Sequence, residues 1–250
     1  MNLKFKQIFK NEVAQKEFEE NGFCVLKLDN LKLIEEIIIA KNNFFTCIDD
    51  GFFLSHYNNN KAKNQEISNK LIELSKVELS NHFIDFEPIV AHFILKKRNH
   101  HETFNLHQDW SYVDENIDLP IQVWIPLQET NKENGGLFIL PESHKNFNPR
   151  SAYFGINMHE ATEIEKEKLL AINLKLGEFV CYHPGVFHGS FENKTKLDRN
   201  AVLIALSHKS ADLFYFEKPS NEFEQYNKKV IQKDFFLADH FNIQNNLIKL

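Results

Sequence analysis

The sequence predicts a mainly β protein with flanking helices, in the form of a β-sandwich or jelly roll decorated by helices. Two observations lead to this fold class. Apolar residues recur at helical spacing in the first part of the chain, whereas short apolar runs separated by turn residues follow from about residue 88 onward. Helices followed by a series of short strands are typical of a sandwich or barrel that helices cover.

The N-terminal part is expected to be largely helical. The segment Glu12–Asn21 is predicted to be a helix, and Gly22 is the residue type that ends a helix in the left-handed conformation. A strand is expected over the apolar run Phe23–Leu28. A further helix is expected over Leu31–Ala40 and another, with a weaker pattern, over Asn64–Val77. In the first of these, one face carries Leu33, Ile34, Ile37 and Ile38.

The remainder of the chain predicts strands separated by turns. The expected strands are Ile89–Lys96, Thr103–Asp109, Ile121–Leu127, Leu137–Leu140, Ala171–Leu176, Glu178–His183, Val186–Ser190 and Ala201–Ser207. With 250 residues, of which 42% are hydrophobic, the chain suits one domain with a substantial core. We expect an N-terminal helical part at about 1–85, a jelly-roll core at about 86–210 and a C-terminal tail at 211–250.

The composition argues against several classes of partner. A net charge of −6 provides no global basic field, so neither nucleic acid nor a membrane is an expected partner. The longest apolar runs, such as Ala201–Leu206, are far too short to span a membrane, and the first ten residues lack the apolar core of a secretory signal. Three scattered cysteines do not form a disulfide framework. We expect a cytoplasmic protein with a small-molecule substrate and make no prediction of its oligomeric state.

A candidate metal site follows from the spacing of three side chains. His107 and Asp109 stand two residues apart in an expected strand, so both point to the same face. Such pairs are common by chance, with about 1.7 expected in a chain of this composition, so the pair alone is weak evidence. His188 lies in a distant strand that a jelly roll can bring opposite. Two imidazoles and one carboxylate on one face of an octahedron are the ligand set of non-haem Fe(II) oxygenases.

An arginine is expected in the same pocket. The chain has only three arginines, and Arg199 follows His188 by 11 residues on the next expected strand. A guanidinium there offers a planar fork for the carboxylate of a ligand, and Ser190 faces the same way. His183 is the alternative distal metal ligand, although it precedes Pro184 in an expected turn. Further candidate contacts are Gln122 on one strand, and Trp110 and Tyr112 beside the metal motif.

The chain resembles the phytanoyl-CoA dioxygenase family of Fe(II)/2-oxoglutarate oxygenases, which includes ectoine hydroxylase. The resemblance extends from Phe18 to about His208. The motifs that carry it are His107-Gln-Asp109-Trp110, Val123-Trp-Ile-Pro-Leu127, Asn134-Gly-Gly-Leu137, Leu140-Pro-Glu-Ser-His-Lys145, Gly177-Glu-Phe-Val180, Phe187-His-Gly-Ser190 and Arg199. One departure is Glu142, where the family usually has glycine. This position concerns a turn rather than the metal.

The resemblance implies a double-stranded β-helix fold and an oxidative reaction. It implies Fe(II) held by His107, Asp109 and His188, with 2-oxoglutarate and O₂ as co-substrates and succinate and CO₂ as products. Arg199 would pair with the distal carboxylate of 2-oxoglutarate. Ser190 would assist Arg199, and Trp124 would pack beside the co-substrate. Because Asp109 is present, hydroxylation or a related oxidation of a small organic molecule is expected rather than halogenation.

Several alternatives remain open at the level of sequence. Trp124 could be an ordinary core residue, and Asp109 could point away from the metal. The protein could be a non-catalytic double-stranded β-helix that binds a metal or small molecule, or an acyl-CoA hydroxylase, although no focused lysine cluster suggests a site for the phosphates of coenzyme A. A nucleic-acid demethylating oxygenase is disfavoured by the acidic charge balance. The segment 146–168 is either a lid over the site or a passive surface loop.

Overall fold

Two antiparallel sheets and three larger helices make up the computed structural model, which describes residues 7–46, 48, 51–57, 60–145, 157–158, 161–217 and 227–237. The helices are α1 Glu12–Asn21, α2 Lys32–Phe44, α3 Lys61–His82 and the short α4 Glu163–Lys168. The strands are β1 Phe23–Lys27, β2 Phe52–Leu54, β3 Phe86–Lys96, β4 Phe104–Gln108, β5 Ile121–Pro126, β6 Leu137–Leu140, β7 Asn157–Met158, β8 Leu170–Ile172, β9 Glu178–Tyr182, β10 Phe187–Ser190, β11 Arg199–His208, β12 Phe214–Glu217 and β13 Asn227–Val230.

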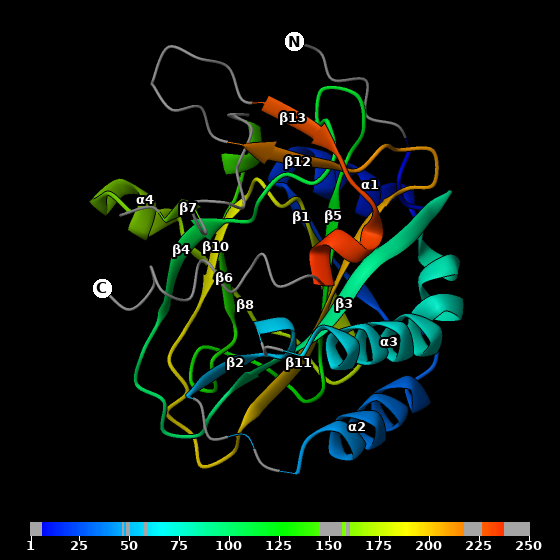
Figure 1. Ribbon diagram of the computed structural model, residues 1–250. Helices are drawn as coiled ribbons and strands as arrows, with labels where there is room; N and C mark the ends of the chain where they lie inside the picture. The colour runs from blue at the N-terminus through cyan, green and yellow to red at the C-terminus, as the bar shows by residue number, and fades with distance from the viewer. Residues whose placement is uncertain are drawn as a thin grey trace.

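The topology of the two sheets confirms the predicted jelly roll. The larger sheet has six strands in the order β1-β9-β5-β11-β3-β2, and the smaller has five in the order β7-β4-β10-β6-β8 (Figure 1). In both sheets, strands that are distant in sequence lie next to each other, as they do in a double-stranded β-helix. A separate antiparallel pair, β12 with β13, comes from the C-terminal tail.

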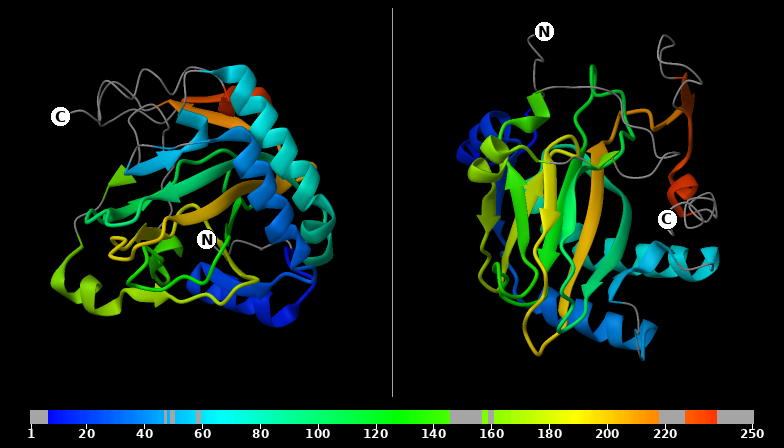
Figure 2. Two further views of the ribbon diagram at one scale, coloured as in Figure 1. Left: turned by 90° about the horizontal axis from the view of Figure 1, so that it is seen from below. Right: turned by 90° about the vertical axis from the view of Figure 1, so that its left-hand side faces the viewer.

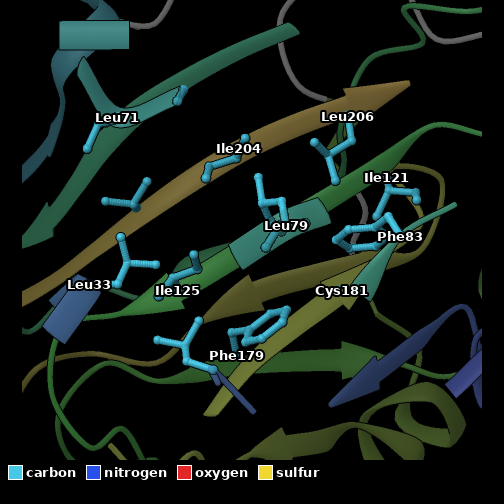
Figure 3. Close-up of a cluster of buried hydrophobic side chains, with 14 of the residues drawn as sticks. Leu33, Leu71, Leu79, Phe83, Ile121, Ile125, Phe179, Cys181, Ile204 and Leu206 are labelled. Carbon is cyan, nitrogen blue, oxygen red and sulfur yellow. The ribbon is translucent and has the colours of Figure 1, made fainter. Parts of the chain in front are cut away.

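Helices α1, α2 and α3 cover the outer face of the larger sheet. Figure 2 shows α2 and α3 side by side on this face. Alternate residues of each strand point toward the helices, as the two-residue period of a strand requires. The resulting outer core combines helix residues such as Leu33, Leu71 and Leu79 with strand residues such as Ile125 and Phe179 (Figure 3).

A second apolar cluster fills part of the space between the two sheets. In β9, Phe179 and Cys181 face the helices, whereas Val180 and Tyr182 face the smaller sheet. The inner cluster also contains Trp124 of the larger sheet and Ile139 of the smaller one. This alternation leaves one inner face on which side chains from both sheets converge, and the polar residues of the candidate site lie there.

Local signals explain why α1 and β1 begin and end where they do. Asn11 caps α1 by accepting hydrogen bonds from the backbone N–H groups of Val13 and Ala14. Gly22 ends the helix with a φ of 84°, a left-handed conformation that glycine adopts without strain. The chain then enters β1, an edge strand of the larger sheet.

Some elements were not expected from the sequence. The three-residue β2 and the two-residue β7 are too short to give a periodic signal, and β7 lies within the segment 146–168, which has no strand pattern. Of that segment, residues 146–156, 159 and 160 lie outside the described part, so its role as a lid stays a prediction. Cys47 and Arg150 also lie outside the described residues. Among the described helices, none is long and apolar enough to cross a membrane.

Candidate metal centre

The structure brings His107, Asp109 and His188 together. His107 on β4 is the direct cross-strand partner of His188 on β10, and the two ring centroids are 4.2 Å apart. Asp109 follows the end of β4. Its two carboxylate oxygens lie 3.7 Å from Nε2 of His107 and 3.7 Å from Nε2 of His188. One potential ligand atom from each of the three residues lies within 4.8 Å of the others, so the three could share one metal ion.

Backbone contacts orient both imidazoles toward the shared point. Nδ1 of His107 is 2.8 Å from the carbonyl oxygen of Asn105, and Nδ1 of His188 is 3.0 Å from that of Val186. Because a carbonyl oxygen only accepts, each Nδ1 carries the proton and each Nε2 retains its lone pair. Burial is the main cause that lowers the pKa of His107 to about 3, and the neighbouring His188 adds to it. His107 is therefore neutral at physiological pH, which is the form that binds a metal.

The carboxylate of Asp109 is also held in place. The backbone N–H of Asp109 donates to the carbonyl oxygen of Pro184 at 2.9 Å, and the hydroxyl of Tyr182 donates to Oδ2 at 3.4 Å. Burial raises the pKa of Tyr182 well above its ordinary value, so this hydroxyl remains a donor. The side chain of Asp109 points toward both imidazoles, which disfavours the alternative in which it points away from the metal.

A glycine next to His188 permits the close approach of β10 to β4. A Cβ atom at Gly189 would overlap the carbonyl oxygen of Phe104 on β4 and the ring of Phe138 on β6. Any larger residue would therefore push the strands apart at the point where His188 faces His107. This steric requirement explains the glycine that follows His188 in the sequence.

Arg199 lies in the same cavity as the three candidate ligands. It begins β11, and only 1% of it is exposed. Its Nε donates to the carbonyl oxygen of Gly135 at 3.1 Å, whereas its Nη1 has no hydrogen-bond partner among the described residues. The guanidinium carbon is 5.5 Å from the ring centroid of Trp124, so Trp124 lies beside the arginine rather than in an unrelated part of the core. Burial lowers the pKa of Arg199 to about 9, which leaves it charged at neutral pH.

Lys96 is a site residue that the sequence did not reveal. It is fully buried, is paired with Arg199 across β3 and β11, and donates from Nζ to the hydroxyl of Ser190 at 2.9 Å and to the carbonyl oxygen of Phe191 at 2.7 Å. Burial, with the nearby Arg199 as the second cause, lowers its pKa to about 7. A lysine at the end of an apolar strand was the only signal. Its place in the site follows from its pairing with Arg199, and this pairing exists only in the folded chain.

His183 does not join the three candidate ligands. Its Nδ1 accepts a hydrogen bond from the backbone N–H of Gly185 at 2.9 Å, and its Nε2 is 3.8 Å from a carboxylate oxygen of the buried Glu115. The ring therefore belongs to the turn before β10, as its position before Pro184 suggested. Trp110, Tyr112 and Gln122, the candidate contacts named from the sequence, all line the cavity.

The residues fit an iron site with a bound oxo-acid. Two imidazoles and one carboxylate are the donor set that non-haem Fe(II) oxygenases use, and all three residues line the cavity. The partnerless Nη1 of Arg199 is a buried donor that a carboxylate in this cavity would satisfy. The cavity thus offers both a metal site and an anchor for an acid.

Comparison with known proteins agrees with this geometry. The family model of Phytanoyl-CoA dioxygenase (PhyH) matches residues 52–201. The peroxisomal phytanoyl-CoA dioxygenase of Homo sapiens is 31% identical over 155 residues, which are 58% of this chain and 44% of that protein. The chain thus spans less than half of the length of this relative.

Two solved structures share the fold at low sequence identity. The epimerase SnoN, in complex with Fe³⁺, alpha ketoglutarate and nogalamycin RO, matches with a TM-score of 0.58 and 12% identity over 87% of this chain and 93% of SnoN. EctD from S. alaskensis, with 2-oxoglutarate and 5-hydroxyectoine, matches with a TM-score of 0.57 and 16% identity over 90% of this chain and 86% of EctD. Because the family model covers more than half of the chain, this protein belongs to the phytanoyl-CoA dioxygenase family.

Proposed function

We propose that this protein is an Fe(II)- and 2-oxoglutarate-dependent dioxygenase that hydroxylates, or otherwise oxidises, a small organic molecule with release of succinate and CO₂. One observation carries the proposal: three correctly oriented metal donors share a buried cavity with a guanidinium that has an unsatisfied donor. Together they match a chemistry that requires a metal and an organic acid side by side.

His107, Asp109 and His188 would hold the iron. When bound, Fe(II) together with O₂ supplies the oxidising chemistry, with 2-oxoglutarate as the source of two electrons. The protein's own contribution is to fix the two Nε2 lone pairs through the carbonyl oxygens of Asn105 and Val186, and to hold the carboxylate of Asp109 through Tyr182.

Arg199 would bind the distal carboxylate of 2-oxoglutarate. Its Nε is already occupied by Gly135, so the guanidinium is fixed and its Nη1 is presented to the ligand. Ser190 would add a hydrogen bond to the same carboxylate, and Lys96 positions the hydroxyl of Ser190. Trp124 would pack beside the co-substrate. These four residues form a desolvated site, where a charge-assisted pair is stronger than in water.

The presence of Asp109 favours hydroxylation over halogenation. A halide can bind a non-haem iron only if the protein leaves one more position open, and a carboxylate donor here removes that position. We therefore expect oxygen rather than chloride to be transferred. The corresponding test is turnover of an identified substrate under ¹⁸O₂ with chloride present. A chlorinated main product, or full activity of Asp109→Ala, would contradict this expectation.

A non-catalytic binding protein is the alternative from another class. The complete donor set and the arginine argue against it, since a scaffold has no need of an unsatisfied guanidinium in the same cavity. The similarity to the human phytanoyl-CoA dioxygenase raises a second alternative, an acyl-CoA hydroxylase. Both alternatives predict a different outcome in the experiments described here and in the next subsection.

Oxygen consumption coupled to succinate formation tests the proposal. The Fe(II)-loaded protein with 2-oxoglutarate should consume O₂ and form succinate, slowly on its own and faster with a substrate from a small-molecule collection. His188→Ala should abolish both signals because it removes a metal donor. Arg98→Ala, which changes an exposed arginine, is the matched control and should retain them. Metal and 2-oxoglutarate binding without succinate, even with a substrate that binds, would favour the non-catalytic alternative.

A further inference from the structure

The cavity has two chemically different ends, which the strand register defines. At one end, Arg199 of β11 is paired with Lys96 of β3. Six residues further along β11, Ala205 is paired with Val90 of β3 on one side and Gln122 of β5 on the other. At about 3.4 Å per residue, the two rows are about 20 Å apart along the strand. The first row is cationic, whereas the second contains no charged residue.

A row that contains a histidine lies between the two ends. Leu203 is paired with His92 on β3 and with Trp124 on β5. The ring of His92 lies 4.2 Å from that of His56, centroid to centroid, and both rings line the cavity. Two adjacent imidazoles in an otherwise apolar wall have no part in holding the metal or the arginine. They belong to the region left for the primary substrate.

One polar atom at the neutral end and one in the adjacent row lack partners in the part of the chain that the structure describes. Oε1 of Gln122 is buried and has no hydrogen-bond partner there, and the same holds for Nδ1 of His92. Only 4% of Gln122 is exposed. Leaving a buried polar atom unsatisfied costs about 1–3 kcal/mol. Such atoms in a cavity are expected where a ligand completes their hydrogen bonds.

The neutral end offers no counter-charge. Burial lowers the pKa of His56 to about 4 and that of His92 well below its ordinary value, and the charge of His56 is a second cause for His92. Both imidazoles are therefore uncharged at neutral pH. The hydroxyl of Tyr112 is already bonded to the carbonyl oxygens of Ile121 and Leu206. Asp109 is the one acidic residue among the described residues that line the cavity, and it would be committed to the metal. A carboxylate, phosphate or ammonium buried at this end would therefore face no available opposite charge among those lining residues and would be strongly disfavoured.

The shape of this end also restricts the ligand. The small side chain of Ala205 separates Val90 from Gln122 and leaves room above the sheet. Ile89 and Trp110 contribute apolar surface. An apolar body would fill this space, and a single polar group would reach the amide oxygen of Gln122. Because that oxygen only accepts, the group of the ligand must be a donor.

We propose that the end of the cavity formed by Val90, Gln122 and Ala205 binds an uncharged substrate through an O–H or N–H group that donates to Oε1 of Gln122. The substrate class is a compact neutral alcohol or amide. This inference rests on the proposed function and extends it, because it excludes free acids and amines, which are charged, and simple esters and thioesters, which carry no donor. His92 lies beside this site and offers a second hydrogen-bonding position.

Competing neutral and charged probes test the inference. Benzamide, methyl benzoate and benzoate share one ring and differ in donor and charge. Their dissociation constants are measured by ligand-observed NMR on the anaerobic protein with Fe(II) and saturating 2-oxoglutarate, so that Arg199 is occupied. Benzamide should bind about fivefold to tenfold more tightly than methyl benzoate, in line with one neutral hydrogen bond. Benzoate should bind more weakly than both.

Two glutamine variants distinguish recognition from structure. Gln122→Leu should reduce the benzamide preference to about one while leaving the unfolding temperature unchanged or raised, because it removes an unsatisfied buried group. Gln128→Leu is the matched control. Gln128 accepts from the backbone N–H of Asn200 and donates to the carbonyl oxygen of Asp198, so its loss should lower the unfolding temperature and leave the preference intact.

The outcomes separate this inference from the proposed function. If wild type shows no visible absorption band with Fe(II) and 2-oxoglutarate, the proposed function fails and the inference fails with it. If the band forms but benzamide is not preferred, only the inference is overturned. Tighter binding of methyl benzoate would point to the acyl class instead. An unchanged preference in Gln122→Leu, with a lower unfolding temperature, would assign Gln122 a purely structural role.

Discussion

Replacing Arg199 by alanine is expected to weaken 2-oxoglutarate binding by about 30- to 100-fold. Arg199 is 1% exposed, and its Nη1 has no partner among the described residues. Removing one partner of a buried charge pair typically costs about 2–5 kcal/mol, and about 2 kcal/mol corresponds to roughly 30-fold in affinity. We place the effect at the lower end of this range. Lys96 is paired with Arg199 and would still attract the carboxylate.

Arg199→Lys tests whether the geometry of the guanidinium matters as well as its charge. Lysine keeps a positive charge but lacks the planar fork and cannot reproduce both the Nε bond to Gly135 and a contact to the ligand. We therefore expect only partial recovery of affinity. Arg98→Ala is the control, because the side chain of Arg98 is 60% exposed and lies outside the cavity.

The assay is an anaerobic titration of 2-oxoglutarate into each Fe(II)-loaded variant. The weak visible absorption band of such iron chelates reports occupancy, and the iron content of each variant is measured in parallel. A dissociation constant for Arg199→Ala within threefold of those for wild type and Arg98→Ala would refute the assignment of the arginine. It would leave the metal site itself unaffected.

Three further predictions concern the metal, a proton and a turn. His188→Ala should abolish the visible band and reduce iron to well below one equivalent, whereas His183→Gln should not; a band retained in His188→Ala would refute the ligand assignment. At pH 8, 2-oxoglutarate binding should take up a proton at up to one equivalent, because the pKa of Lys96 is lowered to about 7 in the empty site and a bound anion restores its charge. This uptake, measured by calorimetry in two buffers of different ionisation enthalpy, should vanish below pH 6, where Lys96 is already protonated, and in Lys96→Met. Glu142→Gly should raise the unfolding temperature by about 2–4 °C, whereas Glu142→Ala should not, because Glu142 has a φ of 67° that strains any residue with a Cβ.

The strands of the core could be predicted because their signal is local. The expected bounds of Leu137–Leu140 coincide with β6, and those of Glu178–His183 differ from β9 by one residue. The prediction for Ala171–Leu176 was wrong in its second half, since β8 ends at Ile172 and the following residues lead into the turn at Gly177. Apolar residues in a turn can be as regular as those in a strand, so the pattern does not mark the end of pairing.

The predicted bounds of the first helix coincide with those of α1, whereas α2 and α3 extend beyond the predicted helices. The prediction of Asn64–Val77 omitted less than one turn at the start and more than one turn at the end of α3, which spans Lys61–His82. Its first turn is polar and begins at Asn60, whose side chain accepts from the backbone N–H of Lys63. Periodicity cannot detect such a turn because no apolar residue marks it.

The candidate metal ligands could be predicted from the sequence, whereas several residues around them could not. His107 and Asp109 form a local motif, and His188 and Arg199 stand at characteristic distances along the chain. Lys96, His56 and His92 carry no such motif. His92 and His56 enter the cavity through the pairing of β3 with β11 and through the placement of the segment after β2, and Lys96 reaches Ser190 beside it. These contacts exist only in the folded chain.

The two histidine ligands and the proposed substrate wall stand on different sheets, and this separation has an evolutionary consequence. His107 and His188 stand on adjacent strands of the smaller sheet, whereas Val90, Gln122 and Ala205 stand on three central strands of the larger one. A substitution at any of the latter three changes the wall that meets the substrate without touching a metal donor. Descendants of such a chain can acquire new substrates one residue at a time while the oxidising centre is inherited intact.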